Sequence, residues 1–116
     1  MEHSTKAKQN LISKKNKARA GEFWSVNSKK INGHKSEIAK RKKNGSVDVV
    51  VLTHAKRTFG KKNIPLQENP QPNDNKPAYV VKNVQRATIN DLGKQHSDIK
   101  ITNPIDKSII RKIKSK

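Results

Sequence analysis

Apolar side chains gather in short segments separated by polar turns, a pattern typical of a protein built from short strands. Aromatic and β-branched residues at 22–26 predict a first strand, and the Asn-Gly turn at 32–33 leads into a weaker second strand at 36–40. Another Asn-Gly turn at 44–45 precedes residues 47–53, which have the highest strand propensity in the chain. Because this aliphatic run is almost unbroken, we predict a central strand that is buried on both faces.

The second half of the chain predicts three more short strands, at 63–66, 78–84 and 86–89. Residues 68–77 hold three prolines and three asparagines, a composition that predicts a long loop. The pair Leu92-Gly93 predicts a turn.

The C-terminal segment predicts a helix of about three turns over residues 104–114. Asn103 is a favourable N-cap, and Pro104 suits the first helical turn. An apolar stripe recurs at helical spacing, formed by Ile105, Ile109, Ile110 and Ile113. We therefore expect a mainly β fold with a closing C-terminal α-helix, arranged as a small bent sheet or partly open barrel.

Domain organisation follows from how little the chain can bury. Residues 1–20 contain six basic residues and two sizeable aliphatics, which predicts a flexible basic tail. The whole chain of 116 residues is 30% hydrophobic and has four aromatic residues, so its core must be small. We expect one domain over residues 21–116.

The charge of the chain indicates its class of partner. It carries 27 Lys and Arg against 9 Asp and Glu, a net charge of +18, and such a surface attracts RNA or DNA by releasing condensed counterions. The absence of cysteine excludes disulfides and thiolate chemistry and fits a cytoplasmic protein. The sequence has no apolar run that predicts a membrane span and no motif for a metal or cofactor, so we expect no membrane partner, metal or cofactor.

Two basic sets flank the central strand and are candidates for contact with a nucleic acid. The set before it is Lys40, Arg41, Lys42 and Lys43, and the set after it is Lys56, Arg57, Lys61 and Lys62. The second set surrounds Phe59, whose ring could stack on a base or, alternatively, pack into the core. Trp24 lies within a predicted strand and is expected in the core.

Two histidines are candidates for proton transfer, because an unperturbed imidazole titrates near neutral pH. His54 follows the central strand directly, and His34 lies beside the first turn. The alternative for each is an exposed or structural polar residue.

The order of these segments resembles that of the MazF/PemK-like type II toxins. Residues 21–27, Gly-Glu-Phe-Trp-Ser-Val-Asn, resemble the family's opening strand, Gly-x-aliphatic-Trp-x-Val-Asp. A loop with Gly-His at 33–34 and an aliphatic strand ending in Thr53 follow in the family's order. The remaining matches, within a resemblance that spans residues 21–114, are 63–66, 80–85, 92–94 and the C-terminal helix.

This resemblance implies an SH3-like barrel, often a homodimer, that cleaves single-stranded RNA without a metal and is neutralised by an antitoxin protein. Thr53 matches the family's catalytic threonine, and Lys35 falls nearest to its catalytic arginine. The family usually has Arg-Pro and an aliphatic residue where this chain has Lys-Ser-Glu. Lysine offers a point charge instead of a bidentate guanidinium. With His54 and Arg57, these residues form the candidate catalytic set.

Two other functions fit the same residues. One is a non-catalytic DNA- or RNA-binding accessory protein of a plasmid, phage or other mobile element, which would bind a strand without cutting it. The other is a ribosome-associated protein whose basic tail contacts ribosomal RNA, which would co-sediment with ribosomes.

Overall fold

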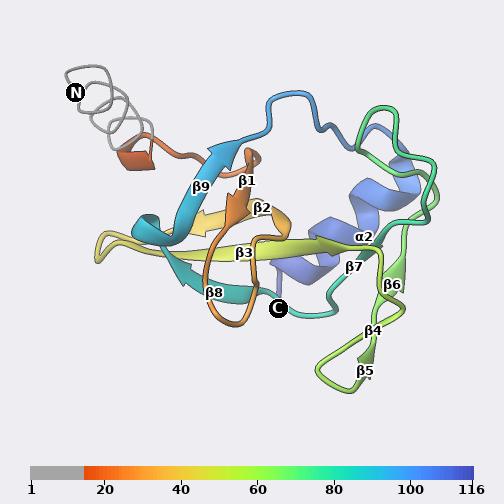
Figure 1. Cartoon of the computed structure of the whole chain (residues 1–116), viewed down its shortest axis with the longest axis horizontal. Coiled ribbons are helices and arrows are strands. Elements are labelled where there is room, and N and C mark those ends of the chain that lie inside the picture. The colour runs from red at the N-terminus through yellow and green to blue at the C-terminus, as the bar shows by residue number, and fades with distance from the viewer. Residues whose placement is uncertain (1–14) are drawn as a thin grey trace.

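The computed structural model describes residues 15–116 and has mainly β-structure with one C-terminal helix, as the sequence predicts (Figure 1). A 3₁₀ turn, η1 (Ile89–Asp91), links the last two strands, and helix α2 (Pro104–Lys114) ends the chain. The strands are β1 (Phe23–Val26), β2 (Lys35–Arg41), β3 (Ser46–Thr53), β4 (Arg57–Thr58), β5 (Lys61–Lys62), β6 (Ile64–Pro65), β7 (Tyr79–Val80), β8 (Gln85–Thr88) and β9 (Leu92–Gln95).

The strands form one bent antiparallel sheet with the order β6-β7-β3-β2-β1-β9, and β8 also pairs with β3. A separate hairpin joins β4 and β5. Within the described residues, β8 and β9 are connected through η1 without a ladder of hydrogen bonds, so the barrel stays open.

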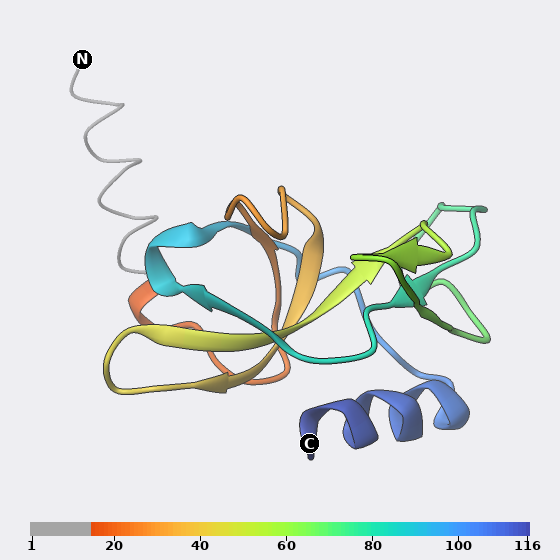
Figure 2. The ribbon, with the colours of Figure 1, turned by 90° about the horizontal axis from the view of Figure 1, so that it is seen from below.

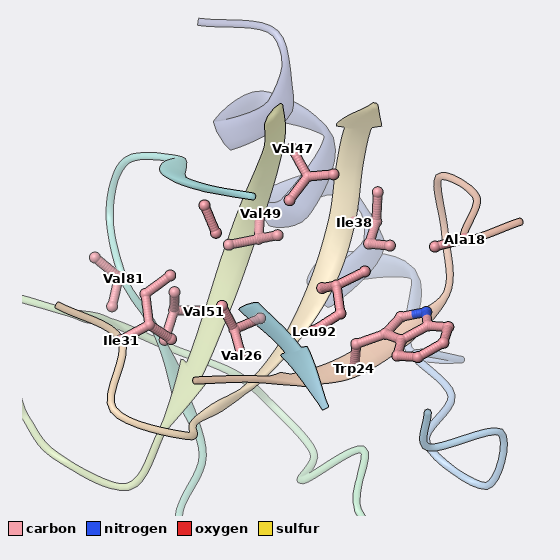
Figure 3. Packing of buried hydrophobic residues seen from close by; sticks show 11 residues of the cluster. Ala18, Trp24, Val26, Ile31, Ile38, Val47, Val49, Val51, Val81 and Leu92 are labelled. Carbon is pink, nitrogen blue, oxygen red and sulfur yellow. The ribbon is translucent and has the colours of Figure 1, made fainter. Parts of the chain in front are cut away.

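The central strand β3 is buried on both faces, as predicted. Val47, Val49 and Val51 point into a cluster inside the bent sheet, where Trp24 is 1% exposed (Figure 3). Val50 and Leu52 alternate with them and point to a second cluster on the opposite face. This alternation is the period of two expected for a strand, and here both sets of side chains are covered.

Helix α2 packs on the second face of the sheet. In the view from below, the helix lies outside the curve of the bent strands (Figure 2). Ile110 and Ile113 of α2 are buried, whereas Ile105 of the predicted stripe is 56% exposed. The Asn103 side chain accepts hydrogen bonds from the backbone N–H groups of Ile105 at 2.9 Å and Asp106 at 3.2 Å. The predicted N-cap is therefore confirmed.

The predicted turn at Leu92-Gly93 is wrong, because both residues lie in β9. Leu92 is 1% exposed and pairs with Val26 of β1. Gly93 serves close packing instead of a turn, since a Cβ atom there would lie 2.7 Å from Nδ2 of Asn27. The chain turns earlier, at η1.

Residues 1–14 of the predicted basic tail lie outside the described residues. Ala18 is 2% exposed and belongs to the cluster around Trp24, so the packed body extends to at least this residue. Within residues 15–116, no helix has the length and apolar content needed to cross a membrane.

Candidate nucleic-acid and catalytic site

Thr53 ends the central strand and lines a cleft. The residue pairs with Tyr79 of β7 and is 8% exposed. Its Oγ1 atom accepts a hydrogen bond from the backbone N–H of Ala55 at 3.1 Å. Because this bond uses a lone pair of the oxygen, the hydroxyl hydrogen can still be donated to a ligand.

Lys35 begins β2 and lines the same cleft as Thr53, although 18 residues separate them in the chain. The cleft has a volume of about 250 Å³, and we call it the threonine cleft. Its lining residues are Gly33, His34, Lys35, Leu52, Thr53, His54 and Gln71. The structure thus brings three of the four predicted catalytic residues to one cleft.

His54 also lines the threonine cleft, but both nitrogens of its ring contact the loop at 68–77. Nδ1 lies 2.9 Å from the carbonyl oxygen of Pro77, which can only accept a hydrogen bond, so Nδ1 donates. Nε2 lies 3.1 Å from Oδ2 of Asp74. His54 therefore interacts with this loop in the described structure.

His34 connects the threonine cleft to a neighbouring hollow. It lines both that cleft and a cavity of about 80 Å³ that also contacts Phe59 and Gln85. The loop before it turns sharply at Asn32 and Gly33, whose φ angles are 53° and 82°. No side-chain hydrogen bond of His34 is found among residues 15–116, which leaves its ring available to a ligand.

Phe59 lies at the tip of the β4–β5 hairpin, so the alternative of a core position is wrong. Its side chain is 55% exposed, and the Lys30 ammonium lies 5.2 Å from the centre of its ring. Both Phe59 and Gly60 have positive φ angles, 54° and 74°, as a two-residue type I′ turn requires. The tight turn leaves the ring partly exposed, and the residue also lines the small cavity beside Val51 and Val81.

A groove of about 520 Å³ runs beside this ring, and we call it the aromatic groove. Its lining residues are Lys30, Thr58, Phe59, Lys61, Lys62, Asn63, Val81, Lys82, Asn83, Val84 and Gln85. Four lysines around one exposed aromatic ring offer contacts for phosphates and for a stacked base in the same groove.

Comparisons with known proteins reveal no relative. No family model matches the chain, and neither do characterised proteins or solved structures. The resemblance to MazF/PemK-like toxins therefore stays a prediction.

The remaining predicted site residues lie apart from the threonine cleft. Arg57 and Lys56 are exposed at the start of the β4–β5 hairpin and line neither the cleft nor the aromatic groove. The set at 40–43 lies at the β2–β3 hairpin, at the opposite end of β3 from Thr53 (Figure 1). Within this set, Lys42 lies 3.7 Å from Asp48, and Arg41 donates to the carbonyl oxygen of Asn16.

Three residues of these surfaces were missed by the sequence analysis. Gln71 accepts a hydrogen bond from Lys35 Nζ at 2.7 Å, Lys30 covers Phe59, and Gln85 is only 7% exposed between the small cavity and the aromatic groove. Gln85 alternates with exposed residues in β8 of the structure, but the sequence Gln-Arg-Ala-Thr at 85–88 does not mark it as buried. Gln71 and Lys30 lie in polar loops, where nothing in the local pattern marks them.

His96 lies near Lys35 and contacts the strand beside it. Its Nε2 atom is 2.7 Å from Oγ of Ser25, which pairs with Lys35 across β1 and β2. Partial burial, together with the positive charges of Lys35 and Lys94, lowers the pKa of His96 below its usual 6.5. A neutral His96 adds no second positive charge beside Lys35.

A larger hollow of about 530 Å³ lies between α2 and the strands β1 and β2, but it contains none of the predicted site residues. Its carboxylate, Glu37, is paired with Lys114 of α2. Among residues 15–116, no group of three or more acidic or histidine side chains is arranged to hold a metal.

Proposed function

We propose that this protein binds single-stranded RNA and cleaves it as a metal-independent endoribonuclease similar to the MazF/PemK toxins. The observation that carries the proposal is that Thr53 and Lys35, from separate strands, line one cleft of about 250 Å³. A hydroxyl and a cation that face the same space can donate hydrogen bonds to one phosphate group.

RNA brings its own nucleophile, so the reaction asks little of the protein. The 2′-oxygen attacks the neighbouring phosphorus, and the bond from phosphorus to the 5′-oxygen breaks. One fragment then ends in a 2′,3′-cyclic phosphate and the other in a 5′-hydroxyl. The 2′-hydroxyl loses a proton, and the leaving 5′-oxygen gains one.

In this scheme Lys35 and Thr53 stabilise the negative charge that grows on the non-bridging phosphate oxygens. His34 accepts the proton of the 2′-hydroxyl, because its ring is not engaged by another side chain within residues 15–116, and water supplies the proton for the 5′-oxygen. His54 is the alternative proton acceptor once its contacts with the loop at 68–77 are broken.

The aromatic groove accommodates the rest of the strand in this proposal. Phe59 stacks on an unpaired base, and Lys61 and Lys62 contact phosphates. Thr53, His34 and Phe59 all line the small cavity of about 80 Å³ between the two regions, so the threonine cleft and the aromatic groove are neighbours on the protein. Bases stacked inside a duplex cannot meet the ring in this way, so the groove favours single strands.

The test uses a fluorescent single-stranded RNA in EDTA with the native protein, Thr53→Val and Thr53→Ser. Valine keeps the shape of threonine but lacks the hydroxyl, so we expect the cleavage rate to fall by roughly 10²–10³-fold, and we expect serine to retain activity. A DNA strand of the same sequence should stay intact because it has no 2′-hydroxyl. Intact RNA with the native protein, or equal cleavage by Thr53→Val, would reject the proposal.

A non-catalytic nucleic-acid-binding protein is the second candidate. Two observations favour it: Lys35 stands where the family has arginine, and exposed cations occur at both ends of β3. Binding of an RNA or DNA strand that the native protein leaves uncut would select this function.

A further inference from the structure

The loop at 68–77 places its own oxygen atoms on the donors of the threonine cleft. Gln71 Oε1 accepts the hydrogen bond from Lys35 Nζ at 2.7 Å. Asp74 Oδ2 lies 3.1 Å from His54 Nε2, and the Pro77 carbonyl oxygen lies 2.9 Å from His54 Nδ1. Three acceptor groups from one loop therefore contact Lys35 and His54, two of the candidate site residues.

This loop holds its own shape through the side chain of Asn69. Asn69 Nδ2 donates to the carbonyl oxygens of Lys76 at 2.9 Å and Asp74 at 3.3 Å, and its Oδ1 accepts from the backbone N–H of Gln71 at 3.0 Å. The amide thus links the two limbs of the loop. As a result, Gln71 and Asp74 are presented together toward the cleft.

The chemistry of these contacts matches that of a phosphodiester backbone. A phosphodiester offers only oxygen acceptors and one negative charge to a lysine or histidine. The Asp74 carboxylate is negative at neutral pH, and the backbone N–H of Lys76 in particular holds its pKa below the usual 3.8. Gln71 adds an uncharged oxygen that accepts a hydrogen bond from Lys35, as a non-bridging phosphate oxygen also can.

We propose that the loop at 68–77 is an internal competitor of the RNA backbone, with its side-chain oxygens holding the places on Lys35 and His54 that phosphate oxygens take when a strand binds. This inference rests on the proposed function, since the strand is the one bound at the threonine cleft. The loop must leave these donors before a strand can use them. His54 is then free to donate a hydrogen bond to a phosphate oxygen, while His34 remains the proton acceptor of the proposed reaction.

A different role for the loop predicts the opposite result. If Gln71 completed the binding site by orienting Lys35, its removal would weaken RNA binding. If it competes with RNA, its removal strengthens binding. The sign of the change in affinity therefore decides between the two roles.

The experiment compares the dissociation constants of a fluorescent 2′-O-methyl RNA, which cannot be cleaved, at one fixed salt concentration. The test variant is Gln71→Ala/Asp74→Asn, and the matched control is Glu68→Gln. The control removes one negative charge from the same loop, but the Glu68 side chain lines neither the threonine cleft nor the aromatic groove. We expect the double variant to bind about tenfold more tightly than the control. A tenfold ratio corresponds to about 1.4 kcal/mol, the free energy expected for the lost hydrogen bonds between the loop and the donors of the threonine cleft.

A second variant and a second measurement guard against an indirect effect. Asn69→Ala keeps both oxygen-bearing side chains but loosens the loop, and it should also bind RNA more tightly than Glu68→Gln. Hydrogen exchange of residues 68–77 in the native protein should become faster when RNA is added. Binding by the native protein with unchanged or weaker binding by the variants, or slower exchange in the loop, would overturn the competitor role and leave the proposed function intact. Absence of RNA binding by every protein would overturn both.

Discussion

The Oδ1 atom of Asp106 on α2 accepts a hydrogen bond from the backbone N–H of Gln67 at 2.7 Å, and Oδ2 accepts one from Glu68 at 3.1 Å. Asp106 is 1% exposed, so this carboxylate fastens the start of the loop at 68–77 to the helix from a buried position. The same helix covers the second core cluster. The hydrogen bonds of Asp106 therefore connect the start of the loop at 68–77 to helix α2.

Loss of this carboxylate should destabilise the fold. In Asp106→Ala two backbone N–H groups lose their acceptors in a buried place, so we expect the free energy of unfolding to fall by about 2–3 kcal/mol. Urea denaturation measures the change. Asp98→Ala removes an exposed carboxylate and should change the stability little. Equal stability of the two variants would show that the buried contacts contribute nothing.

A guanidinium at position 35 should strengthen phosphate binding. Lys35→Arg offers two parallel donors where lysine offers a point charge, so the affinity for single-stranded RNA should rise by about 1 kcal/mol, or roughly fivefold. Fluorescence anisotropy measures the affinity, and Lys94→Arg, an exposed change on β9, is the control. An equal gain in both variants would assign the effect to arginine in general and not to the threonine cleft.

Removal of the exposed aromatic ring should weaken binding of unpaired bases. Phe59→Ala should cost roughly 1–3 kcal/mol of binding free energy for single-stranded RNA, whereas Phe59→Trp should retain the affinity. Ile105→Ala provides a matched control, since Ile105 is the other exposed large apolar residue within residues 15–116 and lies on α2. If Phe59→Ala bound RNA as tightly as Ile105→Ala does, the ring would have no part in recognition.

The helix and most of the strands of the main sheet could be predicted because each depends on local pattern, whereas β4, β5 and β9 were not predicted as strands. The aliphatic run of β3 indicated its burial on both faces, and Asn103 indicated the start of α2, since both signals act over a few residues. Leu92-Gly93 was misread because a glycine in a turn and a glycine pressed against Asn27 look the same in sequence. Which of them applies depends on the tertiary packing.

The candidate site was only partly predictable for the same reason. Thr53 lies at the end of an obvious strand, and the family resemblance marked it. The bond from Lys35 to Gln71, by contrast, joins residues 36 positions apart and depends on how a proline-rich loop folds back. No local propensity specifies that path.

The two basic sets should differ in their effect on salt dependence. For single strands, each lost phosphate contact lowers the slope of log affinity against log salt by about 0.7. Lys61→Ala/Lys62→Ala, in the aromatic groove, should therefore flatten the slope for a trinucleotide by about 1.4. Lys40→Ala/Lys43→Ala makes the same charge change at the other end of β3, away from the aromatic groove, and should leave the slope unchanged. Equal flattening by both pairs would indicate diffuse attraction instead of a localised groove.

The stability of the protein should fall on acidification because of His96. Burial and the neighbouring lysines lower its pKa in the folded state, so below pH 6.5 the unfolded chain binds more protons than the folded one. The contribution of a neutral His96 is therefore complete above pH 6.5 and declines as the pH falls through that value. Urea denaturation between pH 7.5 and 5.5 should show a smaller decline for His96→Gln, which can keep a hydrogen bond to Ser25 but cannot be protonated. The same decline in both proteins would mean that other groups cause it and that His96 is protonated as easily in the fold as in the unfolded chain.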